Sequence, residues 1–287
     1  MVKKSRPPAV SDPHAPDYLL FVDTNIWLDL YRLPTGDDLT KALETIARAH
    51  DRMISTSQVW MEFLKHRQAE ISKTLAAFKT EKDHDPHLPP IIADEEAVKA
   101  LRRLRRDLEE QRRRIAAKVE QIMLEPEHHD PVYQSLRSIF AKPTDLVLGR
   151  ENDRRHQIRR LARKRWHLGY PPRKERDTAI GDAVNWEWIV DCAMRKSGHV
   201  IIVSRDGDYG HAHDKEFYLN DWLKEEFVSR LAGRGSVLLF NRLAAALERM
   251  AVPVPPEVAK AEHRLFTAHA HLSGRAEAAF SAGVALS

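Results

Sequence analysis

The chain has 287 residues, of which 43% are hydrophobic, so it can bury a sizeable core, and disorder of the whole chain is excluded. Lys and Arg number 46 against 42 Asp and Glu, a net charge of +4 that by itself identifies no partner. The single cysteine, Cys192, excludes an internal disulfide and a cysteine-based zinc site, and no apolar run approaches the roughly 18 residues needed to span a bilayer. We therefore expect a cytoplasmic protein rather than a membrane or secreted one.

Four short apolar runs predict the strands of a sheet. After a leader over residues 1–17 that contains several prolines and is expected to be flexible, the run 18–22 is continuously apolar and stops at Asp23, which is typical of a strand buried on both faces. Further strands are expected at 53–55, 200–203 and 237–240, with helices at 178–196 and 220–231. This alternation predicts an α/β fold with a mainly parallel central sheet.

The middle of the chain has a helical pattern with almost no strand signal. Apolar residues at helical spacing form two stripes, which predict two long helices packed as a hairpin: Val59, Phe63, Ile71, Leu75 and Phe78 on the first, and Leu101, Leu104, Leu108, Ile115 and Ile122 on the second. An arginine-rich helix follows at about 150–166. We expect a helical insertion over 67–167, between core segments 18–66 and 168–250, and a C-terminal helix and tail over 251–287.

Four carboxylates are candidates for one site. Asp23 and Asp206 each follow a predicted strand, and ligands of parallel sheets bind beyond the carboxyl ends of the strands. Glu62 and Asp182 lie in the first turns of helices that begin near the same edge. Each acid alone has an ordinary alternative role as a helix cap, a turn former or a solvated residue. Gathered together, they would repel one another unless hard divalent cations such as Mg²⁺ or Mn²⁺ neutralised them.

The acidic segments also resemble those of a known family. Residues 21–29, 57–62, 181–186 and 203–208 are similar, in this order, to the acidic motifs of PIN-domain nucleases, and most similar to a PIN-like branch with a long helical insertion. The resemblance implies a three-layer α/β/α sandwich. It also implies that Asp23, Glu62, Asp182 and Asp206 are catalytic and hold one or two divalent ions.

Five further residues are candidates for this site. The resemblance implies that Thr24 and Asn25 orient the first acid and that Ser204 lies near the last. Asp208 competes with Asp206 as the last ligand, because a shift of one residue at a strand end changes the face that a side chain occupies. Asp177 is either an additional metal ligand or the N-cap of the following helix.

The chemistry expected of such a site is hydrolysis of a phosphodiester by metal-activated water. The resemblance favours RNA over DNA and 5′-phosphate products. Candidate nucleic-acid-binding residues are Arg173, Lys174 and Arg176, just before Asp182, and Arg159 and Arg163 in the arginine-rich helix. An ion-paired, solvated helix face is the alternative explanation for such arginines.

Three other classes of function compete with a metal-dependent nuclease. A PIN-like nucleic-acid-binding or scaffolding protein without catalysis is the main alternative, although all four acidic positions are filled. A phosphatase of the haloacid-dehalogenase type needs a second acid where Asn25 stands, and no glycine-rich loop supports a P-loop NTPase. The sequence does not choose between a toxin with an antitoxin partner, a phage-defence effector and an RNA-processing enzyme, and it leaves a homodimer open.

Overall fold

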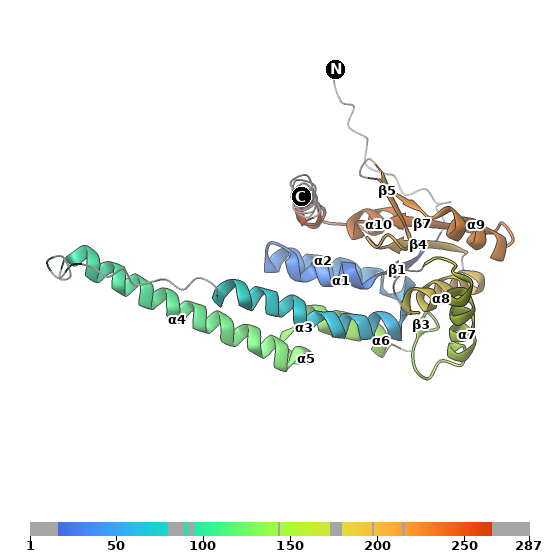
Figure 1. Cartoon of the computed structure of the whole chain (residues 1–287). Helices are drawn as coiled ribbons and strands as arrows, with labels where there is room; N and C mark the ends of the chain where they lie inside the picture. Colours follow the sequence, from blue (N-terminus) through green and yellow to red (C-terminus); the bar gives the residue numbers. More distant parts are fainter. Residues whose placement is uncertain are drawn as a thin grey trace, which may run out of the picture.

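The centre of the molecule is a five-stranded parallel sheet (Figure 1). The computed structural model describes residues 17–79, 89, 91, 95–142, 144–172, 180–196, 198–213 and 216–265. The strand order is β3-β2-β1-β4-β7, and every pair is parallel. The strands are β1 (Leu19–Val22), β2 (Met53–Thr56), β3 (Val147–Leu148), β4 (His199–Val203) and β7 (Ser236–Phe240). The predicted α/β fold with a parallel sheet is confirmed.

Helices cover both faces of this sheet. Helices α7 (Arg155–Leu168), α8 (Gly181–Arg195) and α9 (Asp221–Arg230) pack on one another, and α8 contacts β2 and β4. Right-handed crossovers place the opposite set on the other face: α1 (Thr24–Asp29), α2 (Gly36–Arg48), α6 (Pro131–Ala141) and α10 (Leu243–Arg249). The strands β1 and β4 between them are almost completely buried, which explains why both read as continuous apolar runs.

The region 67–167, for which only helices were expected, also contributes to the sheet and its core. Strand β3 pairs with β2, and Val132, Leu136 and Ile139 of α6 are buried in the main hydrophobic core. The strand has only two residues, too few to produce a recognisable pattern. The sequence also did not reveal the antiparallel hairpin of β5 (Gly210–His213) and β6 (Glu216–Leu219).

Two long helices form an arm that projects from the sheet (Figure 1). They are α3 (Ser57–Lys79) and α4 (Glu96–Leu124), which contact each other and lead into the short α5 (Pro126–His129). On α3, Val59 and Phe63 pack in the main core. On α4, by contrast, the apolar stripe is exposed, with Leu104 at 66% exposure and Leu108 at 44%. The predicted packing of the two helices on each other is seen near the base of the arm, where Ile71 is buried, but much of the α4 stripe stays exposed because α4 extends well beyond α3 (Figure 1).

A buried ion pair fixes the base of this arm. The Arg67 Nε donates to Asp130 Oδ2 at 2.6 Å, and the two side chains are 3% and 1% exposed. Asp130 also accepts from the hydroxyl of Tyr31 at 2.6 Å, and it caps α6 by accepting from the backbone N–H of Tyr133. The guanidinium of Arg67 also reaches the carbonyl of Ile122 on α4. Helices α3, α4 and α6 are thus joined at one buried point.

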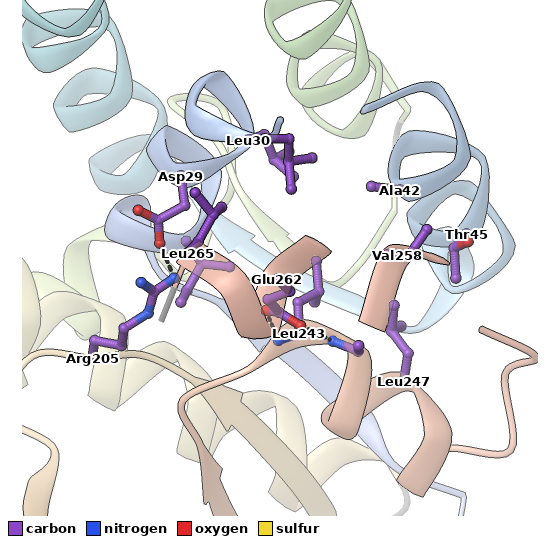
Figure 2. A pocket seen from close by; sticks show the side chains of 13 residues that line it. Asp29, Leu30, Ala42, Thr45, Arg205, Leu243, Leu247, Val258, Glu262 and Leu265 are labelled. Atoms are coloured by element: carbon purple, nitrogen blue, oxygen red, sulfur yellow. Dashed lines mark hydrogen bonds and ion pairs between the residues drawn. The ribbon is translucent and has the colours of Figure 1, made fainter. Parts of the chain in front are cut away.

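A short helix over residues 256–265 contributes Val258 and Glu262 to the wall of a pocket (Figure 2). It packs beside α1, α2 and α10 around a small apolar cavity. The carboxylate of Glu262 accepts from the backbone N–H groups of Leu243 and Ala244, and so caps α10. At the edge of this cavity Arg205, which follows β4, pairs with Asp29 of α1 (Figure 2). No helix within the described residues is long and apolar enough to cross a membrane.

Candidate metal centre

The site begins where β1 and β4 end side by side. The carboxylate of Asp23 is buried and accepts from the backbone N–H of Thr24 at 2.7 Å, from Asn25 Nδ2 at 2.8 Å and from Ser204 Oγ at 2.6 Å. Ser204 also accepts from the backbone N–H of Asp206 at 3.0 Å. One serine therefore links the acids that follow two neighbouring strands, and the orientation of Asp23 is set by three donors.

Helix α3 supplies the next acid. Glu62 accepts from Thr24 Oγ1 at 3.1 Å and from Gln58 Nε2 at 2.6 Å. The backbone of Gly181, at the start of α8, lies against the same pair: a Cβ there would stand 2.5 Å from Gln58 Nε2 and 2.8 Å from Glu62 Oε1. Any side chain at this position would push the flexible ends of Gln58 and Glu62 aside, so the glycine lets α8 approach α3 without disturbing Glu62, and close helix packing brings Glu62 and Asp182 to one cleft.

Of the four acids, Asp182 has the least stabilisation of its negative charge by neighbouring donors. It lies in the first turn of α8, and among the described residues none donates a hydrogen bond to its carboxylate. Burial, and then the negative charges of Asp23 and Glu62, raise its pKa to about 8. Burial also raises the pKa of Asp23 to about 6, even though its hydrogen bonds act in the opposite direction. The cleft therefore concentrates more negative charge than its surroundings neutralise.

All four predicted acids line one cleft of about 300 Å³. Asp206 is among its lining residues and Asp208 is not. The charge of Asp208 nevertheless contributes to the raised pKa of Asp182, and its backbone N–H donates to Asp206 Oδ1 at 3.3 Å. The geometry thus favours Asp206 over Asp208 as the acid that faces the cleft.

Only some of the predicted basic residues lie in the part of the chain that the structure describes. Arg173, Lys174, Arg176 and Asp177 lie outside the described residues. Arg159 and Arg163 do not enter the acidic cleft, but they line a separate pocket that shares Gln58 with it.

Several residues at the cleft were not predicted. Lys65 and His66 lie three and four residues after Glu62 on α3, so helical spacing could have placed them at the same opening. Tyr209 is fully buried nearby, and in the part of the chain that the structure describes its hydroxyl has no hydrogen-bond partner. Burial and the charges of Asp182 and Asp23 raise its pKa well above the usual value. No sequence signal distinguishes this tyrosine from one in an exposed turn.

The donor set fits a hard divalent cation. Carboxylate oxygens are the ligands that Mg²⁺ and Mn²⁺ prefer, and a cation would remove the repulsion that raises the two pKa values. Within the described ranges no three acidic, histidine or cysteine side chains already stand in a ligating arrangement. Binding would therefore have to draw the carboxylates together and displace the proton from Asp182.

Comparison with protein families gives an independent result. A family model described as PIN domain matches residues 20–209. The chain belongs to the PIN-domain family. The matched part contains all four acids of the cleft and the helical region between them, so the resemblance read from the acidic segments is confirmed. Comparisons with curated proteins and with solved structures gave no match. The PIN-domain family is of the nuclease type, and its members typically use divalent metal ions and interact with nucleic acid.

Proposed function

We propose that this PIN-domain protein is a metal-dependent endonuclease that hydrolyses phosphodiester bonds, with RNA as the favoured substrate. The observation that carries the proposal is the convergence of Asp23, Glu62, Asp182 and Asp206 on one cleft, where the pKa of Asp182 is raised to about 8. A protein gains nothing in stability from such a cluster, and strongly perturbed carboxylates in a cleft are typical of catalytic sites.

Each residue has a separate role in this proposal. When bound, Mg²⁺ or Mn²⁺ lowers the pKa of an attacking water and stabilises the leaving oxygen. Asp23 is held in a fixed orientation by Thr24, Asn25 and Ser204, and therefore provides a preorganised ligand. Asp182, whose pKa is raised to about 8, would hold the cation only in its deprotonated form. No separate catalytic base is required.

Two more side chains of the cleft suit the substrate rather than the cation. Lys65 and His66 are exposed at the opening, beside Glu62. A Lys ammonium and a protonated His can donate to phosphate oxygens, and a substrate held there would present its phosphodiester to the carboxylates.

The preference for RNA follows from the resemblance to PIN-domain nucleases, and so does the expectation of 5′-phosphate products. A role as a toxin with an antitoxin partner or as a phage-defence effector is part of the same proposal, as is a homodimer. A PIN-like protein that binds nucleic acid without cutting it is the alternative that the experiment below separates.

The test is a cleavage assay with the full-length protein. Labelled RNA and DNA are incubated with Mg²⁺, Mn²⁺ or EDTA, beside the variants Asp23→Asn and Asp182→Asn. We expect cleavage only with a divalent cation, and a loss of about 100-fold or more in both variants, because several kcal/mol of transition-state stabilisation disappear. Glu44→Gln, which changes an exposed acid on α2, is the matched control and should cut like the wild type. Cleavage that survives both cleft substitutions would refute the mechanism, and inactivity of the wild type on every substrate would favour the binding protein.

A further inference from the structure

A second pocket, of about 200 Å³, adjoins the acidic cleft. Helix α7 lines it with Arg155, Arg159 and Arg163, and helix α3 lines it with Ser57 and Gln58. We call this set the arginine pocket. Its three arginines are spaced by four residues, so they lie on one face of α7 and point to the same side.

The positive charge of this face is not neutralised within the described residues. Other arginines of the same region have acidic partners: Arg154 pairs with Asp191 at 2.6 Å, and the buried Arg165 pairs with Glu187 at 2.9 Å. In the same part of the chain, no ion pair involves Arg155, Arg159 or Arg163. Among the described residues, the arginines of this region are therefore of two kinds. Some are held in ion pairs within the fold, and others have no counter-charge.

Three further observations favour the binding of an anion in this pocket. The Nε of Arg155 is buried and, in the described part of the molecule, has no hydrogen-bond partner. The pKa of Arg159, although its side chain is exposed, is lowered by partial desolvation and by the positive charges of Arg155 and Arg163. Like charges four residues apart also destabilise a helix, and the first turn of α7 contains no acid to offset them. A bound anion would relieve all three.

The arginine pocket and the acidic cleft share a wall. Gln58 lines both, and it donates to Glu62 Oε1 at 2.6 Å on the side of the acids. Ile180 lines the arginine pocket, whereas the next two residues, Gly181 and Asp182, line the cleft. The two pockets therefore adjoin each other at Gln58 and at the start of α8.

We infer that the arginine pocket binds a backbone phosphate of the same nucleic-acid strand whose neighbouring phosphodiester lies at the carboxylates. This inference rests on the proposed nuclease function, and it assigns the anchoring of the substrate strand to α7. Arg155, Arg159 and Arg163 supply the donors, and Gln58 connects the anchored phosphate to Glu62. The contact is to the backbone, so it positions the strand without reading its bases.

Binding is measured apart from cleavage. The full-length protein is titrated in EDTA with short labelled single-stranded RNA and DNA at several salt concentrations. The double variant Arg159→Ala/Arg163→Ala is compared with Arg160→Ala/Lys164→Ala, which removes two exposed charges from another face of the same helix. We expect the pocket variant to bind about 10-fold or more weakly, with a salt slope reduced by about 1 or more, and the control to stay within about 2-fold of the wild type.

The outcomes distinguish the two proposals. Equal losses in both double variants, or no loss in the pocket variant, would overturn the arginine pocket, since the binding would then depend only on total charge. A wild type that never cuts, combined with a binding loss confined to the pocket variant, would refute the nuclease and support the pocket. With Mn²⁺ and an active wild type, the pocket variant should raise KM and leave kcat within about 2-fold. Its melting temperature should not fall, because the substitution removes repulsion.

Discussion

Replacing Asp182 by Asn should make the metal-free protein more stable, although it removes a residue from the centre of the site. The asparagine is neutral and has nearly the shape of a protonated aspartate, so it keeps the fold and loses the need for a proton. In the unfolded chain Asp182 has its ordinary pKa of 3.8, whereas burial and the neighbouring acids raise the folded value to about 8. Between these values the folded state binds the extra proton, and the free energy of unfolding of the wild type therefore falls as the pH rises from about 4 to about 8.

The magnitude follows from the two pKa values. At pH 7 the unfolded carboxyl has lost its proton and the folded one has kept it, a difference of about 3 pKa units and therefore about 4 kcal/mol. Solvent reaches Asp182 from the cleft and screens the neighbouring charges, so we expect about half of this, or about 2 kcal/mol. At pH 5 the same argument gives about 1 kcal/mol. The variant should melt about 5 °C above the wild type at pH 7, and about 2 °C above it at pH 5.

The assay is thermal unfolding in EDTA at several pH values, repeated with Mn²⁺. The cation should reverse the order, because a ligand at 100 times its Kd stabilises the wild type by about 2.7 kcal/mol, whereas the variant lacks a ligand. Glu44→Gln, on the surface of α2, should follow the wild type throughout. An Asp182→Asn variant that melts below the wild type in EDTA at pH 7, or whose advantage is the same at pH 5, would show that Asp182 is not held in an unfavourable environment.

Three other substitutions test the supports of the site and the fold. Gly181→Ala places a methyl group against Glu62, so Mn²⁺ affinity should fall about 10-fold with little change in melting temperature; an unchanged affinity would mean that Glu62 does not bind the cation. Asp130→Asn leaves Arg67 buried with an uncompensated charge, and chemical denaturation should show a loss of about 3–5 kcal/mol; a loss under 1 kcal/mol would exclude this pair as the anchor of the arm. Glu262→Ala removes the cap of α10 and should lower stability by about 1 kcal/mol in the same assay, and no loss would show that helix 256–265 does not hold α10.

The best predicted parts of the fold are those in which local sequence and burial agree. Strand β1 is apolar at every position because helices cover both faces of the sheet, and its end at Asp23 marks the site at the same time. The convergence of Asp23 and Asp206 followed from the geometry of parallel strands, Glu62 and Asp182 were added because their helices begin near the same edge, and the resemblance to the PIN-domain family strengthened the set of four.

The parts that could not be predicted depend on residues that are distant in the chain. The segregation of the arginines of α7 is an example: Arg165 is structural because Glu187 lies on another helix, and only the tertiary fold brings the two together. Tyr209 follows two aspartates and a glycine, which is typical of an exposed turn, yet the packing of the sheet buries it completely. Strand β3 is too short to be visible at all.

The pairing of the strands also determines at what point during synthesis the site can form. Leu19 at the start of β1 pairs with Val200, and β4 is in turn covered at its other edge by β7. During synthesis β1 cannot pair with β4 until β4 has left the ribosome. A nascent or truncated chain that ends before β4 therefore carries Asp23, Glu62 and Asp182 without Asp206 and without the Ser204 hydroxyl that orients Asp23, so the four carboxylates can come together only after β4 has been made.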